Sequence, residues 1–290
     1  MIPRRRTAFT LVELLVVIAV IALLVSTLVP ALAGARARTM QQAGQSNLRH
    51  LQIANALHAD AHDARFLPGA IDIAPPPSVR PRENTHRWFG TRDTPSGLFR
   101  DDGPISAYLD GDATSAAVRT DPAFAGVLED LARTGAGFER GCGGYGYNAA
   151  FVGAVRERDA QGRWNLARRT IGGKSRIVGD DTGARRSMFR APARTIAFAD
   201  CALATDRLLE YAFVEPAWWP NIPGFRPDPS IHFRHGSADG GRANIVWLDG
   251  HVSSETRTAT QDSQFYPAKA STLGLGWFGD ASSNDLFDYR

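Results

Sequence analysis

Cysteine and lysine are scarce in this chain, and each shortage excludes something. With only Cys142 and Cys201, the sequence cannot supply a four-cysteine zinc site or a disulfide-rich scaffold. The sequence does not decide whether these two residues form a disulfide with each other. Such a bond would persist in an oxidising compartment. Only Lys174 and Lys269 are lysines. Arginine therefore supplies nearly all of the positive charge, a usage as typical of a GC-rich genome as of any function.

A basic surface is also missing outside the N-terminal segment. Residues 1–38 contain five arginines and one glutamate, whereas the rest of the chain holds 28 basic and 29 acidic residues. A nucleic-acid-binding domain needs a clustered positive face, so we expect no nucleic acid partner. No Gly-rich phosphate-binding loop follows a strand, and no Gly-x-Ser-x-Gly motif occurs. We expect a protein that is not an enzyme and has no cofactor, and a structural calcium ion is considered below as an alternative.

One long apolar run dominates the N-terminal region. The twenty residues from Leu14 to Ala33 carry no charge, and a helix of that length, at ~1.5 Å per residue, spans roughly 30 Å of bilayer. Three arginines at positions 4–6 precede the run, and Arg36 and Arg38 follow it. Because cytoplasmic flanks are the more basic, this small difference favours a cytoplasmic N-terminus and an extracytoplasmic C-terminal part.

Three interpretations of this segment are open. The first is a cleavable secretory signal with a small-residue cleavage site at residues 31–33. The second is a twin-arginine signal, which residues 5–9 match only in part. The third follows from residues 8–19, Ala-Phe-Thr-Leu-Val-Glu-Leu-Leu-Val-Val-Ile-Ala, which resemble the class III leader of type IV pilins and type II secretion pseudopilins. We favour the third interpretation, because the matching string is long and its polar positions coincide with those of the family.

The resemblance to the pilin leader implies processing by a prepilin peptidase. The peptidase would cut between Ala8 and Phe9 and methylate the new amine of Phe9, although family members usually have glycine where Ala8 stands. The resemblance further implies that Glu13 neutralises the Phe9 amine of its own or a neighbouring chain, which sets the register of packed helices. The alternative for Glu13 is an extension to the lipid headgroups. Pro30, where pilins often carry a proline, would bend the helix.

The helical pattern continues beyond the bilayer to a stop signal, Phe-Leu-Pro-Gly, at residues 66–69, so that the helix should end near Arg65. His58 and His62 on this stretch have helical spacing but lack a third metal ligand, so we expect them to be structural. The face predicted to pack on the domain comprises Met40, Ala43, Leu51, Ala54, Leu57 and Ala61. The predicted parts are a leader (1–8), a transmembrane helix (9–33), its extracytoplasmic continuation (34–66) and an α+β globular domain (67–290).

Short elements separated by long loops are expected in the globular domain. A β-hairpin is the clearest, with Asp249-Gly250 as a two-residue turn between an alternating strand and a returning segment at residues 251–253. The other expected elements are a helix at 122–133 and strands at 85–90, 144–148, 194–199 and 243–248.

The hairpin belongs to a second resemblance. His235 is followed by thirteen residues and then by Asp249, Gly250 and His251. This arrangement is similar to the His-x(n)-Asp-Gly motif of pseudopilin-like proteins common in Planctomycetes, although their interval is about nine residues. The motif marks the family without defining a chemistry. Its residues either serve turn geometry and hydrogen bonding, which we favour, or converge as a general base or metal site.

Two further features suggest binding. The tail residues Asp280, Asn284 and Asp285 offer oxygen ligands of the kind that Ca²⁺ prefers, and major pseudopilins bind a structural Ca²⁺ in a C-terminal loop; a frayed polar tail is the alternative. Trp218 and Trp219, in a Pro-rich loop, would form a platform for a sugar or a partner, or pack over a sheet edge.

The resemblances imply an α+β, pilin-like fold in which a long N-terminal α-helix packs on an antiparallel β-sheet. The implied function is a structural subunit in the inner membrane, single-pass and with an extracytoplasmic domain, that assembles with homologous subunits into a pilus-like or secretion-linked filament. The alternatives are a tethered or secreted module that binds glycan through Trp218 and Trp219, and a periplasmic hydrolase using His235, Asp249 and His251.

Overall fold

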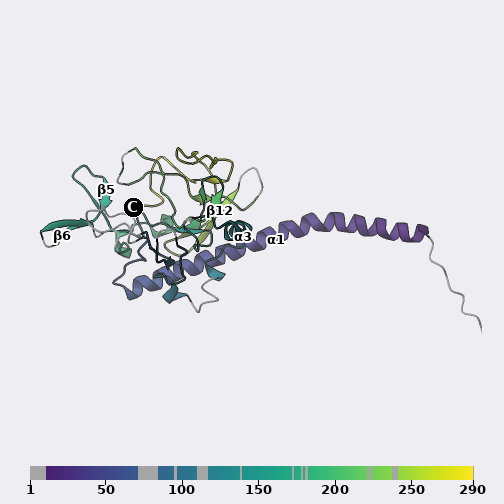
Figure 1. Ribbon diagram of the computed structural model, residues 1–290, viewed down its shortest axis with the longest axis horizontal. Helices are drawn as coiled ribbons and strands as arrows, with labels where there is room; N and C mark the ends of the chain where they lie inside the picture. The colour runs from purple at the N-terminus through teal and green to yellow at the C-terminus, as the bar shows by residue number, and fades with distance from the viewer. Residues whose placement is uncertain are drawn as a thin grey trace, which may run out of the picture. The chain divides into compact units, whose positions relative to one another are not determined.

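The computed structural model describes residues 11–70, 84–94, 97–109, 117–137, 139–171, 173–177, 179, 182–220, 222, 224–236 and 241–289. Its contacts divide the chain into two compact units, Met1–Met40 and Gln41–Arg290. A single helix, α1 (Leu11–Ala61), contributes to both units, and Figure 1 shows it as the purple to blue coil.

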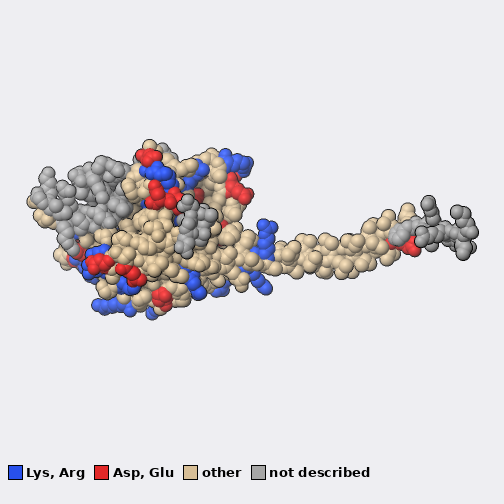
Figure 2. Space-filling view, turned by 90° about the horizontal axis from the view of Figure 1, so that it is seen from below, with Lys and Arg blue, Asp and Glu red and all other residues tan. Residues whose placement is uncertain are grey.

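The first unit contains the apolar part of α1. Its large hydrophobic side chains from Leu11 to Leu32 are exposed, and Figure 2 shows this stretch as an almost uniformly tan surface. Pro30 lies inside the helix, where it removes one backbone donor without ending the helix. Among the described residues, α1 is the one helix long and apolar enough to cross a membrane. The expectation of one long helix is confirmed.

A four-stranded antiparallel sheet forms the centre of the second unit. Its strand order is β13-β12-β8-β3, and the four strands are β3 (Tyr145–Tyr147), β8 (Ile196–Asp200), β12 (Arg242–Trp247) and β13 (Val252–Thr256). These are the strands expected from residues 144–148, 194–199 and 243–248 and from the hairpin. The hairpin loop holds three residues rather than two, since Trp247 N–H donates to the His251 carbonyl at 3.0 Å. Gly250 at φ +93° supplies the left-handed position that such loops need.

The remaining elements are short and surround this sheet. Helix α3 (Ala125–Thr134) confirms the helix expected at 122–133, but the strand expected at 85–90 is a tight pair, β1 (His86–Arg87) and β2 (Gly90–Thr91). The other two-stranded sheets are β4 (Arg156–Arg158) with β5 (Trp164–Leu166), β6 (Arg168–Ile171) with β7 (Lys174–Ile177), β9 (Leu203–Ala204) with β10 (Leu208–Leu209), and β11 (Ile231–His232) with β14 (Leu275–Gly276). Single 3₁₀ turns form η1 (Ser106–Tyr108), η2 (Arg186–Met188) and η3 (Pro192–Arg194).

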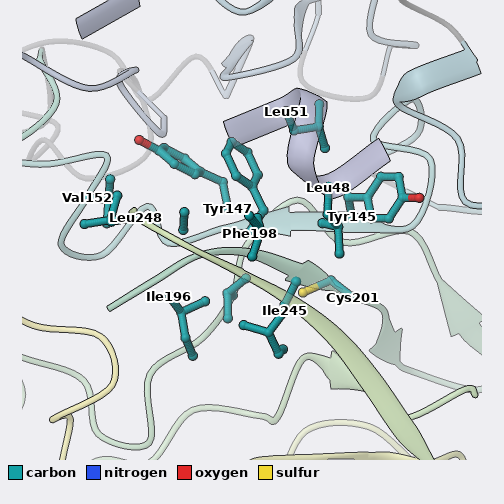
Figure 3. Close-up of a cluster of buried hydrophobic side chains, with 14 of the residues drawn as sticks. Leu48, Leu51, Tyr145, Tyr147, Val152, Ile196, Phe198, Cys201, Ile245 and Leu248 are labelled. Carbon is teal, nitrogen blue, oxygen red and sulfur yellow. The ribbon is translucent and has the colours of Figure 1, made fainter. Parts of the chain in front are cut away.

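Helix α1 packs its second part on one face of the central sheet. Leu48 and Leu51, both fully buried, lie over Tyr145, Tyr147 and Phe198 (Figure 3). The antiparallel register places Tyr147 opposite Phe198, so these rings share the helix-facing side. The other face of the sheet has its own apolar side chains, which include Ile245 and Cys201. The long helix therefore covers an antiparallel sheet in an α+β, pilin-like arrangement.

The buried face of α1 differs in part from the predicted face. Leu51 and Ala54 are buried as expected, whereas Leu57 is 47% exposed. The buried face instead includes the polar residues Gln52 and Asn55. Gln52 Nε2 donates to the Leu248 carbonyl at 2.7 Å, and Asn55 Oδ1 accepts from Leu67 N–H at 3.0 Å. Hydrophobic periodicity cannot detect a face that is held by amide hydrogen bonds.

The helix also ends earlier than its stop signal suggests. Its last residue is Ala61 rather than a residue near Arg65. Asp63 and Ala64 then adopt positive φ angles of 54° and 57°, which a right-handed helix does not accommodate. The early end lets Phe66 N–H bond to the Ala184 carbonyl at 3.1 Å, so the packing of the following segment determines the boundary.

Candidate functional site

Two parts of the molecule carry features beyond ordinary packing, and the first is the apolar part of α1. Glu13 lies in its first turn and is exposed, and Pro30 lies within the helix. Ala8 and Phe9 lie outside the described residues, as does the expected pairing of the Phe9 amine with Glu13. Apolar surface of this extent is not stable against water, so this stretch requires lipid or other helices around it.

The second part is a buried polar cluster around His235. This histidine forms a β-bridge with Arg242, beside the start of β12. Its Nε2 lies 3.0 Å from Asp200 Oδ2 and 2.9 Å from Asn244 Nδ2. Asp200 ends the buried strand β8, and Asn244 is the third residue of β12. The sheet register thus brings both side chains to the helix-facing side beside His235.

A second carboxylate completes the cluster. Single ligand atoms of Asp121, Asp200 and His235 all lie within 4.8 Å of one another, and all three residues are buried. The turn before α3 positions Asp121, whose N–H donates to the Gly143 carbonyl and whose Oδ1 accepts from Ala123 N–H, both at 2.9 Å. Burial raises the pKa of Asp121, because the surrounding protein penalises its charge.

Arg234 provides the neighbouring positive charge. Its Nη1 lies 3.3 Å from Asp121 Oδ2, while its Nη2 donates to the carbonyls of Gly144 at 2.7 Å and Cys201 at 3.1 Å. The guanidinium also lies over the ring of Phe124. Its position is thus determined largely by the backbone and an aromatic ring, with Asp121 as one contact among several.

Helix α1 covers the cluster directly. A side chain at Gly44 would lie 3.4 Å from both Asp121 Oδ1 and Asn244 Nδ2. On either side of this glycine, Gln41 and Gln45 donate to Asn244 Oδ1 at 3.5 and 3.1 Å. The cluster therefore lies at the contact between the long helix and the sheet, sealed from water.

The structure separates the other motif residues from His235. Asp249 lies in the hairpin loop and His251 follows that loop, both at the opposite end of the six-residue strand β12, a separation of roughly 15 Å at ~3.3 Å per residue. There His251 Nδ1 is 2.7 Å from Asp249 Oδ1, and both side chains are partly exposed. The convergence of His235, Asp249 and His251 considered for a hydrolase is therefore wrong for these positions, because the length of strand β12 lies between them.

The two cysteines are separate thiols in the structure. Cys142 and Cys201 are both free and buried, and burial raises the pKa of each thiol. Cys201 Sγ lies 3.6 Å from the Phe213 carbonyl and packs against Gly146, where a side chain would collide with the sulfur. The disulfide considered from the sequence is thus not formed here.

Side chains of the polar tail form hydrogen bonds with backbone groups. Asn284 Oδ1 accepts from Trp218 N–H at 2.9 Å, and its Nδ2 donates to the Trp218 carbonyl at 2.7 Å. Asp280 Oδ1 accepts from Ser282 N–H at 2.8 Å, and Ser283 Oγ accepts from Asp285 N–H at 3.4 Å. These contacts order the tail, and the calcium site considered there, as an alternative to a frayed polar tail, stays a prediction.

The paired histidines of α1 also bond to the backbone. His58 Nδ1 lies 3.1 Å from the Arg65 carbonyl, and His62 Nδ1 lies 2.9 Å from the His58 carbonyl. The two rings stack with centroids 4.0 Å apart, a geometry for packing rather than chelation. Desolvation lowers the pKa of His58.

An aromatic pocket of about 510 Å³ opens elsewhere on the globular unit. Trp219 lines it, whereas the ring of Trp218 is covered by the Arg226 guanidinium at 4.5 Å. The two tryptophans therefore do not form one open platform. Tyr211 donates to the buried Glu215 at 2.6 Å. Desolvation raises the pKa of Glu215 to about 7. The other main aromatic walls are Phe213, Phe225, Phe265 and Tyr266.

The fold and the apolar helix define a pilin-like class of protein, and a comparison with protein families agrees. Residues 3–29 match the model described as the prokaryotic N-terminal methylation motif. No match was found among curated proteins or among solved structures. The matched motif and the apolar helix together indicate a membrane-anchored, extracytoplasmic protein processed by a prepilin peptidase. The match covers the N-terminal segment and does not reach the buried cluster.

Of the residues in the buried cluster, Asp121 and Asp200 were not predicted from the sequence as site residues. Asp200 carried a weak signal, since it ends a strand of otherwise apolar residues. Asp121 carried none, because it lies in a turn far along the chain from His235. Only the folded sheet brings the three residues together.

Proposed function

We propose that this protein is a structural pilin-like or pseudopilin subunit. Prepilin peptidase cuts between Ala8 and Phe9 and methylates Phe9, and the mature chain stays in the inner membrane with its globular domain outside. Subunits then assemble by lateral packing of α1 into a pilus-like or secretion-linked filament. The observation that carries this proposal is the apolar part of α1, which begins within the matched motif and whose large hydrophobic side chains are exposed.

The position of Glu13 supports assembly rather than anchoring alone. A carboxylate within a membrane helix costs about 3 kcal/mol or more when it is unpaired, and a simple anchor gains nothing from that cost. In a bundle of such helices, the amine of Phe9, on the same chain or on a neighbouring chain, offsets the charge, and pairing between chains favours one axial register. Catalysis forms no part of this proposal, and the globular domain serves packing or binding.

The first test is the mass and N-terminal sequence of the full chain purified from its native membrane. Methylated Phe9 as the first residue is expected. Residue Gly34 as the first residue would reveal an ordinary signal peptide and end the proposal.

The second test compares Glu13→Ala with Glu129→Gln, a matched change of an exposed carboxylate on α3. Glu13→Ala should stay in the membrane but lose at least tenfold of the sedimentable, cross-linkable assemblies, because the register contact is gone. Glu129→Gln should assemble as the unchanged chain does. Equal assembly of the two variants would refute the register role of Glu13.

A second candidate function is a tethered binding module, favoured by the aromatic pocket that Trp219 lines. Aromatic faces beside carboxylates suit sugar rings. On this alternative, Trp219→Ala abolishes binding to a glycan array, and Glu13→Ala leaves the function of the protein unchanged. Normal function after Trp219→Ala, with assembly lost after Glu13→Ala, would reject the alternative.

A further inference from the structure

The buried cluster contains carboxylate oxygens that the described residues leave unsatisfied. Asp121 and Asp200 are both fully buried. Asp121 Oδ2 and Asp200 Oδ1 make no hydrogen bond within the described part of the chain. Even the 3.3 Å approach of Arg234 Nη1 to Asp121 lacks hydrogen-bond geometry, since neither atom is bonded. An unsatisfied buried carboxylate oxygen is costly, so these atoms require an additional partner.

The network around His235 makes its Nε2 a third electron-pair donor. Asn244 Nδ2 lies 2.9 Å from this nitrogen and donates to the Gln41 carbonyl at 3.4 Å. Asn244 Oδ1 accepts from Gln45 Nε2 at 3.1 Å. Because the backbone carbonyl of Gln41 cannot donate, the amide orientation is consistent from both sides. With the amide N–H₂ donating to it, Nε2 is the unprotonated ring nitrogen, and an ion bound here would take its lone pair in place of this hydrogen bond.

We propose that Asp121, Asp200 and His235 hold a divalent transition-metal ion, with Zn²⁺ as the best fit, at the contact between α1 and the sheet. Three lone-pair atoms converge within 4.8 Å of one another. Around a tetrahedral zinc ion with ~2.1 Å bonds, donors lie roughly 3.4 Å apart, so a small contraction completes the site. A set of one imidazole and two carboxylates suits Zn²⁺ or Mn²⁺, whereas Ca²⁺ and Mg²⁺ prefer oxygen alone.

This ion would have a structural role. The site is fully buried and lies beneath Gly44 of α1, so no substrate reaches it. Binding would join the turn before α3, the end of β8 and the bridge at His235, and would fix the sheet face that supports the long helix. The role assigns a purpose to His235, which the filament proposal leaves unexplained, and it does not depend on that proposal.

The main rival is a metal-free network. A protonated His235 would balance Asp200, Arg234 would balance Asp121, and a buried water would reach the unsatisfied oxygens. Arg234 keeps its backbone contacts to Gly144 and Cys201 in either case. The two states differ in metal content, which is directly measurable.

The experiment measures metal in the full-length protein, purified in detergent from cells grown with added ZnCl₂ or MnCl₂. Elemental analysis after dialysis should find about one zinc per chain, and growth with Co²⁺ should give the visible absorption bands of a Co²⁺ ion in a nitrogen and oxygen site. These readouts use the unchanged chain and do not depend on a variant that folds. Absence of stoichiometric zinc, manganese and cobalt would overturn the proposal in favour of the metal-free network.

Variants locate the ion. His235→Gln and Asp121→Asn should each reduce the zinc content at least tenfold. The matched control is His251→Gln, which alters the exposed histidine–aspartate pair of the hairpin and should keep about one zinc per chain. Zinc lost from His251→Gln but retained in His235→Gln would place the ion on the hairpin and refute the assignment.

Discussion

The two parts of helix α1 differ in which side chains they expose and bury. The first part exposes apolar side chains, and the second part buries some polar ones. From Leu11 to Leu32 the large side chains are apolar and exposed. From Gln41 to Ala61 one side of the helix is buried against the domain, yet several of its contacts there are amide hydrogen bonds, such as those of Gln45 and Gln52. The first part therefore depends on lipid or other helices, whereas the second part depends on this chain's own sheet. The stability of the first part of the helix thus comes from lipid or neighbouring helices, and that of the second part comes from contacts within the same chain.

The largest expected effect tests this difference with two leucines. Leu51→Ala removes a fully buried side chain from the helix–sheet contact and should lower the free energy of unfolding of the globular unit by about 2–5 kcal/mol. Leu24→Ala removes a side chain that is 63% exposed and should change it by less than ~0.5 kcal/mol. Urea unfolding of the full chain in detergent, followed by tryptophan fluorescence, measures both values. Equal effects would show that the two parts do not differ in this way.

A pH effect of similar size is expected from the globular unit alone. Desolvation of Glu215 raises its pKa from 4.5 to about 7, so the folded protein retains a proton that the unfolded chain releases. The free energy of unfolding should therefore fall as the pH rises from 4.5 to about 7, by on the order of 3 kcal/mol, and then level off. Below pH 4.5 both states are protonated and the contribution is constant.

The variant Glu215→Gln should remove this slope, because it has no proton to release. Glu129→Gln, at an exposed position, should keep it. Unfolding curves of the three proteins between pH 4 and 8 measure the difference. A slope that persists in Glu215→Gln would assign the pH dependence to other groups.

The smallest of these effects concerns the polar contacts of the second part. Gln52→Ala leaves the Leu248 carbonyl without its donor at 2.7 Å and Asn55 without an acceptor at 3.0 Å. The free energy of unfolding should fall by about 1–3 kcal/mol. Gln42→Ala, on the exposed side of the helix, should be neutral. A neutral result for Gln52→Ala in the same unfolding experiment would mean that packing alone holds the helix.

The four central strands and the long helix were predictable because their sequence patterns are local. The uncharged run from Leu14 to Ala33, the apolar residues of β8 and the Asp-Gly turn each act within a few positions of the chain. The predicted helix face was only half correct, since Leu57 is exposed and Gln52 is buried. Amide groups that bond to a distant loop carry no periodic signal.

By itself, the sequence determined the membrane helix, the methylation motif and the alternation of the central strands, because hydrophobicity and turn chemistry depend on neighbouring residues. Only the tertiary structure decided which motif residues meet. It placed His235 with Asp121 and Asp200 and left His251 with Asp249 at the far end of β12. The physical reason is that strand register and the β-bridge at His235 bring together residues far apart in the chain, while the six-residue strand β12 separates residues that are near one another in the sequence.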